Sequence, residues 1–203
     1  MPRTKEAFEE MRLATRQKVK MATLSLVARK GISVTIEEIA KSAGLSKGLL
    51  YNHYPSKEAL IAELAQEAAM ASRQNLNEIA QSDKVASEKI KRITTLMCDM
   101  LSSKENRGAD YFMFMAQVGL SGFLTQKRDA LTLPHSTEIL AKIIAAGQAE
   151  GSIVEGDSLQ LAITYWATIQ GLGQQMVMAG SGLQVEAKML LRILLKNSEL
   201  NEM

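Results

Sequence analysis

Apolar side chains recur three or four residues apart along nearly the whole chain, which is the spacing of one face of an α-helix. The first such stripe lies within residues 8–30, where Leu13, Val19 and Leu26 share a face and Gly31 ends the pattern. Alternation at period two is scarce, and the chain holds only three prolines. The pattern therefore predicts an all-α protein. Further helices are expected at residues 56–80, 87–101, 110–124, 136–149, 157–178 and 183–195.

Residues 35–54 carry a more specific pattern, two short helices around a tight turn. Thr35 is placed to cap the first helix, and Glu38 completes a capping box. Gly44 supplies the left-handed residue that ends this helix, and Ser46 caps a second one of about two turns. This arrangement is typical of a helix-turn-helix unit, whose second helix enters the DNA major groove. The alternative is a plain pair of surface helices, but the second helix is too rich in hydrogen-bond donors for packing alone.

The predicted helices divide the chain into a small N-terminal domain and a larger one. Residues 1–55 form the helix-turn-helix domain, in which residues 1–7 are a loose basic arm. The larger domain, residues 56–203, is helical throughout. Its first helix, at about 56–80, starts beside the small domain and is expected to act as a mechanical connector.

Charge is distributed unevenly between these two parts. Residues 1–60 hold 11 Lys or Arg against 6 Asp or Glu, whereas the remaining residues hold 13 against 16. A basic first third beside a mildly acidic remainder suits a DNA-binding head on a body that avoids phosphate. The N-terminus is charged and lacks a signal peptide, and no apolar run approaches the roughly 20 residues of a membrane span. The expected location is cytoplasmic.

A family resemblance rests on a basic helix, a Thr-led helix and two runs of sequence. These runs are Gly-Leu-Ser-Lys-Gly-Leu-Leu-Tyr-Asn-His-Tyr at residues 44–54 and Pro-Ser-Lys-Glu-Ala-Leu at residues 55–60. Over about residues 10–65 the chain resembles the TetR family of bacterial transcriptional regulators. The resemblance implies that residues 56–203 bind an effector and dimerise. The candidate DNA-binding residues are Thr35, Ser46, Lys47, Gly48, Leu49, Tyr51, Asn52, His53, Tyr54 and Lys57.

Several of these residues have a physical role that can be stated. Lys47 starts the second helix, where its ammonium can donate to guanine O6 or N7. Tyr51, His53 and Lys57 resemble the family's phosphate-contacting positions, and Tyr54 is expected to pack with its hydroxyl exposed. Leu49 departs from the small or hydroxyl residue often found there in the family. It faces either a thymine methyl group or the core, and the sequence leaves both open.

Methionine and aromatic residues gather on adjacent predicted helices of the larger domain. Methionine fills irregular gaps in cores, and it also lines adaptable binding surfaces. Core packing is the alternative for each residue taken singly. Taken together, the methionine and aromatic residues predict a hydrophobic pocket, since the resemblance to the TetR family implies that effectors bind in this domain. The candidate ligand-binding residues are Met97, Met100, Tyr111, Phe112, Met113, Phe114, Met115, Gln117, Trp166 and Gln170.

The last two predicted helices, 157–178 and 183–195, resemble the family's dimerisation pair. Ala167 and Gly171 give the first of them a surface that permits close approach, and Leu190 and Leu194 belong to the broad apolar face of the second. Two copies would present their DNA-reading helices about 34–36 Å apart, on successive major grooves. The alternative is that this apolar face is buried within the monomer.

No catalytic, metal-binding or cofactor-binding pattern stands out. His53 and His135 lie far apart without acidic residues at ligand spacing. Cys98 reads as a buried small hydrophobe, with a thiol sensor as the alternative. The sequence therefore favours a homodimeric, ligand-responsive regulator, a repressor that releases a palindromic operator when a small hydrophobic effector binds, and no enzyme. The alternatives are a constitutive DNA-binding protein or activator without an effector, and an all-helical enzyme or lipid carrier.

Overall fold

The computed structural model describes residues 5–102, 108–121, 133–179 and 185–200. In this part the chain is helical and forms no strand beyond an isolated antiparallel bridge between Ile153 and Leu195. The helices are α1 (Lys5–Lys30), α2 (Ile36–Ser42), α3 (Lys47–Tyr51), α4 (Lys57–Gln81), α5 (Ala86–Ser102), α6 (Gly108–Leu120), α7 (Leu133–Ala149), α8 (Ser158–Ala179), α9 (Ala187–Leu191) and α10 (Asn197–Leu200). The all-α prediction is confirmed.

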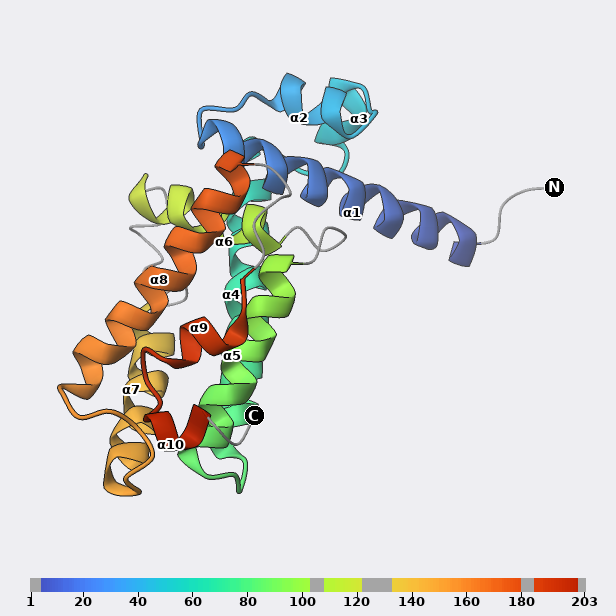
Figure 1. Cartoon of the computed structure of the whole chain (residues 1–203). Coiled ribbons are helices and arrows are strands. Elements are labelled where there is room, and N and C mark those ends of the chain that lie inside the picture. Colours follow the sequence, from blue (N-terminus) through green and yellow to red (C-terminus); the bar gives the residue numbers. More distant parts are fainter. Residues whose placement is uncertain (1–4, 103–107, 122–132, 180–184, 201–203) are drawn as a thin grey trace.

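Helices α1 to α3 form a head at one end of the molecule, and α5 to α10 form a body (Figure 1). Helix α4 runs from the head along the body, as the connector was predicted to do. Helix α1 starts at Lys5, so residues 5–7 are helical and their assignment to a loose arm was wrong. The predicted end of the sixth helix at residues 122–124 and the loop at residues 180–182 lie outside the described residues.

The prediction of one continuous last helix at residues 183–195 was wrong. Helix α9 ends at Leu191, and the chain then turns back along the loop that follows α7. There the amide of Val154 donates to the carbonyl of Leu194 at 2.9 Å, and the amide of Lys196 donates to the carbonyl of Ser152 at 3.1 Å. These hydrogen bonds to the loop take the place of bonds that a continuous helix would make. The spacing of the leucines does not predict them.

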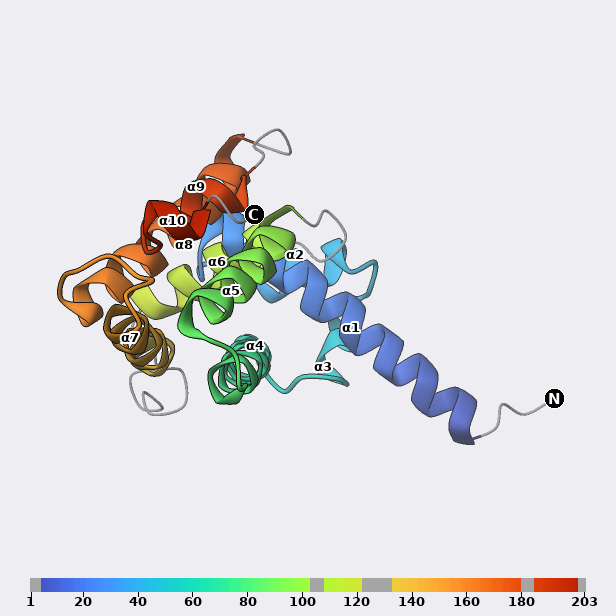
Figure 2. The same cartoon turned by 60° about the horizontal axis from the view of Figure 1, so that its bottom comes forward.

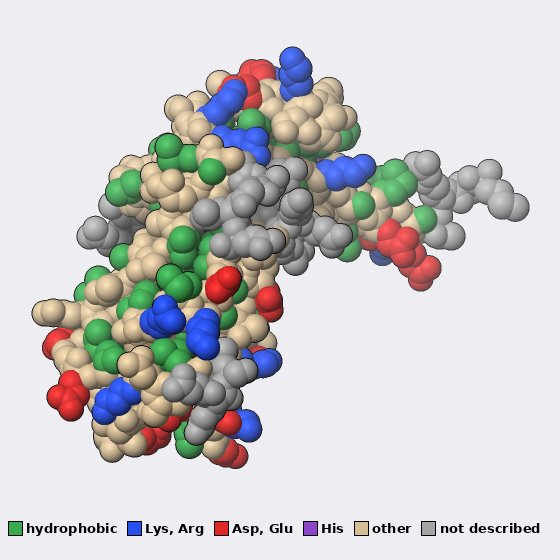
Figure 3. All heavy atoms as spheres, viewed as in Figure 1, with side chains coloured by type: hydrophobic (Ala, Val, Ile, Leu, Met, Phe, Trp, Pro, Cys, Tyr) green, Lys and Arg blue, Asp and Glu red, His purple; other side chains and the backbone are tan. Residues whose placement is uncertain are grey.

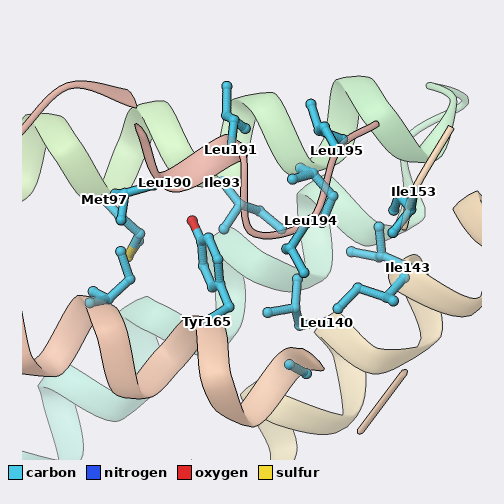
Figure 4. Close-up of a cluster of buried hydrophobic side chains, with 14 of the residues drawn as sticks. Ile93, Met97, Leu140, Ile143, Ile153, Tyr165, Leu190, Leu191, Leu194 and Leu195 are labelled. Carbon is cyan, nitrogen blue, oxygen red and sulfur yellow. The ribbon is translucent and has the colours of Figure 1, made fainter. Parts of the chain in front are cut away.

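The leucines of this C-terminal segment fill the centre of the body instead of forming an exposed face. Figure 4 shows Leu190, Leu191, Leu194 and Leu195 among side chains of the longer helices, and all four are buried. Tyr165 of α8 lies in the same cluster, with its hydroxyl 2.9 Å from the hydroxyl of buried Thr94. The dimer surface predicted at residues 183–195 is therefore corrected, because its apolar side chains are used within the monomer.

The core of the head contains residues from outside the head. Helices α1 to α3 and the start of α4 contribute most of it, including Ile39 and Leu50. Phe114 and Val118 of α6 belong to the same cluster and are 0 % and 2 % exposed. The predicted boundary after residue 55 falls in the turn between α3 and α4, and the packing continues across it.

Helix α6 also carries buried polar contacts to its neighbours. The hydroxyl of Ser25 on α1 donates to Oδ2 of Asp110 at 2.6 Å, and both side chains are buried. The hydroxyl of Tyr111 donates to the carbonyl of Ala68 on α4 at 3.0 Å. Because a buried carboxylate is destabilising without a partner, Asp110 fixes α6 against α1. Figures 1 and 2 both show α6 lying against the C-terminal end of α1.

Charged side chains join α1 to α4 on another side of the head. A guanidinium nitrogen of Arg16 lies 2.5 Å from Glu63, whose carboxylate is also 2.8 Å from the ammonium of Lys20. The guanidinium of Arg16 stacks over the ring of Tyr54, 4.3 Å from its centroid. Partial burial opposes ionisation of Glu63, but the hydrogen bonds from Lys20 and Arg16 outweigh it and lower the pKa of the carboxyl.

Replacing Glu63 with Gln is expected to lower the free energy of unfolding by about 1 kcal/mol at pH 7, since the half-exposed pair is screened by solvent. Because the folded state lowers the pKa of Glu63, its contribution is present above the unfolded value of about 4.3 and is lost as pH falls through the folded value. Urea denaturation from pH 7 to pH 3 should show the stability difference between the two proteins closing. A difference that persists at pH 3 would contradict this account.

Replacing Leu194 with Ala is expected to lower the free energy of unfolding by about 2–5 kcal/mol, because the side chain is fully buried. The matched control is Val85→Ala between α4 and α5, whose side chain is 53 % exposed and whose loss should change stability by less than about 0.5 kcal/mol. Sedimentation of the native Leu194→Ala protein should show an unchanged size. Dissociation of the native variant would place Leu194 in a subunit interface instead.

Candidate nucleic-acid interface

Helix α2 is started by the capping box that the sequence predicted. The amide of Glu38 donates to the Thr35 hydroxyl at 3.2 Å, and the amide of Thr35 donates to the Glu38 carboxylate at 2.9 Å. The hydrogen bond from Lys30, followed by those from Thr35, lowers the pKa of Glu38 to about 2. The Thr35 hydroxyl is therefore occupied by its hydrogen bond at the start of α2. This local bond fixes where the helix begins.

The turn between α2 and α3 depends on Gly44, whose φ of 71° is a left-handed conformation that glycine adopts without strain. The amide of Leu45 then donates to the carbonyl of Ala40 at 2.9 Å, which closes the end of α2. Ser46 caps α3 by accepting from the amide of Leu49 at 3.2 Å. Helix α3 has only five residues, fewer than the two turns predicted.

Helix α3 is held by one buried residue and exposes the others. Leu50 is fully buried in the head core. Leu49 and Tyr51 are 42 % and 45 % exposed, so Leu49 does not belong to the core, and its contact with a thymine methyl group stays a prediction. The remaining exposed candidates on and beside this helix are Ser46, Lys47, Gly48 and Asn52. A Cβ atom at Gly48 would meet no other atom within 4 Å, so this part of the surface is open to close approach.

Tyr54 does not belong to this surface. Its side chain is 2 % exposed, and its hydroxyl is buried with no hydrogen-bond partner among the described residues. Both its assignment as a DNA-binding residue and the expected exposure of its hydroxyl were therefore wrong. The side chain packs inward beneath Arg16, whose guanidinium nitrogen also donates to the carbonyl of His53 at 2.8 Å. Arg16 therefore fixes the chain just after α3.

His53 and Lys57 lie at the edge of the surface and are partly buried. Partial burial, then the nearby charges of Arg16 and Arg12, lowers the pKa of His53, which favours a neutral imidazole at pH 7. The ammonium of Lys57 donates to the carbonyl of Ile32 at 2.9 Å, in the turn after α1. A phosphate contact by Lys57 would have to share or replace this bond.

Lys47 is paired within the head. Its exposed ammonium lies against the carboxylate of Glu37 on α2. The hydrogen bond between them lowers the pKa of Glu37 and raises that of Lys47, so both groups are charged at pH 7. Exposed pairs of this kind are weak, and a base or a phosphate can displace the carboxylate.

The predicted ligand-binding residues divide between two environments. Phe114 lies in the head core, with Tyr111 and Met115 packed against it, so these three residues are separate from the body core that holds other candidates. Met97 is buried in the body core, and Met100, Phe112 and Trp166 pack against that core. Met113, Gln117 and Gln170 are half-buried, and the amide oxygen of Gln117 faces Gly31.

One polar group in the body core is not satisfied. The indole N–H of Trp166 is buried and has no hydrogen-bond acceptor among the described residues. Indole is a donor only, and buried donors are usually paired, so this group requires an explanation. Nearby in the chain, Gly173 lets α8 approach α6, because a Cβ atom there would lie 2.9 Å from Phe112.

Two further candidates can be placed. Cys98 is buried, and burial, followed by the charge of Asp99, raises the pKa of its thiol, which disfavours the reactive thiolate. Across the described ranges no group of three His, Cys, Asp or Glu side chains is arranged to hold a metal ion. Within the same ranges, no helix has the length and apolar character needed to cross a bilayer.

The comparison with protein families supports the reading of the head. Residues 21–64, which span the C-terminal part of α1 through the start of α4, match the model for bacterial regulatory proteins of the tetR family. No curated protein matches the chain in sequence.

Solved structures similar to the whole chain are regulators of the same kind. The MbdR regulator from Azoarcus sp. CIB has 20% identity and a TM-score of 0.75, over 93% of this chain and 98% of its own. A transcriptional regulator from Saccharomonospora viridis in complex with choline has 23% identity and a TM-score of 0.63, over 92% and 93%. NalD, the secondary repressor of the MexAB-OprM multidrug efflux pump in Pseudomonas aeruginosa, has 17% identity and a TM-score of 0.63, over 92% and 99%.

The family match and the fold agree with each other. The match covers the helix-turn-helix head, and the fold shared with these regulators extends through the body. Residues 21–64 therefore form a head of the tetR family of bacterial regulatory proteins, and the whole chain has the fold of TetR-family transcriptional regulators.

Proposed function

We propose that this protein is a homodimeric repressor that binds a palindromic operator and releases it when a small, largely hydrophobic effector binds the body. The observation that carries the proposal is the exposed surface of α3. Lys47, Leu49, Tyr51 and Asn52 project from a helix whose Leu50 is anchored in the core. A short, rigidly held helix with exposed donors and one apolar side chain suits base-edge contacts in a major groove.

Four side chains on this surface have a proposed partner. Lys47 leaves Glu37 to donate to a guanine, and Leu49 packs on a thymine methyl group. Tyr51 and Lys57 contact phosphate, with the exposed backbone at Gly48 allowing the helix close to the DNA. Thr35, Ser46, Asn52 and His53 complete the surface around them.

The homodimer is proposed to form through α8. Figure 3 shows hydrophobic side chains gathered along this helix on one face of the body. Leu159, Ile163 and Met178 are 48 %, 52 % and 73 % exposed, and the small exposed residues Ala167 and Gly171 lie between them. A two-fold axis through this stripe would bury it against its own copy. Met189 of α9, 59 % exposed, is the contribution of the C-terminal segment.

The proposed effector site surrounds the indole N–H of Trp166. A ligand with a hydrogen-bond acceptor would satisfy this buried donor, and Met97, Met100 and Phe112 of the same core supply apolar contact. Gln170 follows Trp166 by one helical turn on α8. The choline in the S. viridis structure supports a small molecule as the kind of effector.

A route from this site to the DNA is proposed through α6. Phe112 belongs to the body core, whereas Phe114, two residues later, lies in the head core. A ligand that displaces Phe112 would therefore move α6 against α1 and strain the Ser25–Asp110 bond. Ligand and DNA would then favour different positions of the head, with a coupling free energy of about 1–3 kcal/mol.

The proposal is tested by selecting bound sites from random DNA with the purified protein at several salt concentrations. Enrichment of a palindrome, with affinity falling steeply in salt, is the expected result. Recovery of DNA without a shared motif would favour a constitutive, non-specific binder. Absence of binding even at low salt, in protein freed of small molecules by refolding, would contradict the proposal.

Lys47→Ala is expected to weaken operator binding and to relax the preference at one base pair, because it removes a base contact worth about 1–3 kcal/mol. Tyr51→Phe should weaken every sequence to the same degree, because phosphate contacts carry no base information. Fluorescence anisotropy on the operator and on single-base variants measures both. The control is Lys84→Ala, an exposed lysine far from α3. If Lys47→Ala lowered the affinity for all sequences equally, Lys47 would not read a base.

Ile163→Arg is expected to convert the dimer to a monomer, because it places a charge in the centre of the proposed interface. Val85→Arg is the matched control, since Val85 is a similarly exposed apolar residue, 53 % exposed, outside α8. Analytical ultracentrifugation gives the mass of each variant, and circular dichroism checks the fold. A folded Ile163→Arg protein that stays dimeric would exclude this face.

A further inference from the structure

A groove lies at the end of the body away from the head, between the C-terminal end of α4, the start of α5 and α7. Figures 1 and 2 show these parts of the molecule together at that end. Its volume is about 350 Å³, within the range of small-molecule sites. None of the residues proposed above to bind DNA or effector lines it.

The floor of the groove is apolar. Ile139 and Ile143 of α7 are 9 % and 6 % exposed, and they lie with Ala80, Ala86 and Ala146 along the groove. These side chains offer a surface for a hydrocarbon chain and no hydrogen-bonding group. Asn77 and Gln81 are the uncharged polar residues at its side.

The rim of the groove is cationic. Lys84, Lys89 and Lys142 line it, against the single carboxylate of Glu150. That carboxylate is already used, because it accepts a hydrogen bond from the amide of Ala86 at 3.0 Å, at the start of α5. Lys89 donates to the carbonyl of Ala80 at 2.9 Å, and Lys84 lies 3.4 Å from the exposed carboxylate of Glu88.

Lys142 is the ammonium group at this rim with the greatest freedom to take a ligand. It is exposed, and no ion pair or hydrogen bond of its side chain is found within the described ranges. It lies on α7 between Ile139 and Ile143 in sequence, one turn from the former, so its charge stands beside the apolar floor. The groove therefore joins an apolar surface to an excess of positive charge.

We propose that this groove binds a medium-chain carboxylate, with the hydrocarbon chain on Ile139 and Ile143 and the carboxylate at Lys142 and Lys84. An amphipathic anion matches both the apolar floor and the cationic rim, whereas an amphipathic cation would be repelled by the rim and an uncharged polar molecule would gain nothing from the floor. The site is separate from the effector site proposed around Trp166, and it goes beyond the proposed function.

The test is isothermal titration of the full chain with octanoate and decanoate below their micellar concentrations, without DNA. Decanoate should bind up to about 15-fold more tightly than octanoate, because burying each methylene group contributes about 0.8 kcal/mol. Lys142→Glu should weaken decanoate binding about tenfold, and Ala146→Trp, which fills the groove from its edge, should abolish it. Lys188→Glu, an exposed lysine on α9, is the matched control and should bind as the natural protein does.

Three results would overturn the proposal. The first is the absence of decanoate binding at millimolar concentration. The second is equal binding of decyltrimethylammonium, which would show detergent-like adsorption without regard to charge. The third is binding that survives both groove substitutions but falls in Trp166→Phe, which would place the molecule in the body core. Because the assay contains no DNA, none of these results depends on whether the protein represses.

Discussion

The packing of α6 into the head is the constraint on which the rest of the structure depends. Phe114 and Val118 complete a core that the three helices of the head do not fill by themselves. Asp110, buried on the same helix, accepts a hydrogen bond from Ser25 that helps to offset the cost of burying its carboxylate. A movement of α6 that kept its body contacts would therefore open a cavity in the head or leave a buried carboxylate without this partner. The head and the body cannot shift independently.

The head contact through α4 adds ion pairs to the apolar packing of Leu60 and Ile61. The charges that join α1 to α4 are partly exposed, and Glu63 is shared between Arg16 and Lys20. Shared, solvated ion pairs tolerate small changes in distance better than a packed aromatic side chain does. The start of α4 is also packed into the head core through Leu60 and Ile61, so both α4 and α6 fix the position of the head. The sequence indicated α4 alone as the connection between head and body. The packing of Phe114 and Val118 shows that α6 connects them as well.

What the sequence could predict follows from the range of the interactions involved. Caps and turns depend on residues close together in the chain. The sequence therefore predicted correctly that Thr35 and Ser46 cap α2 and α3 and that Gly44 follows the end of α2. Tyr54 was misplaced, because which side of a helix is covered depends on elements far away in the chain. The prediction of a continuous last helix was wrong for a similar reason. Hydrogen bonds from the amide of Val154 and to the carbonyl of Ser152 determine the path of the C-terminal segment. Leucine spacing carries no information about them.

The shared core of the head bears on how proteins of this architecture can be recombined. A hybrid that joined residues 1–55 to the body of another regulator would keep the reading helix and lose the side chains that Leu50 and Ile39 pack with across the boundary. The transplanted head would carry an apolar hollow in place of Phe114 and Val118. In this chain the unit that can be exchanged is therefore discontinuous, and it includes the last two turns of α6 together with the start of α4.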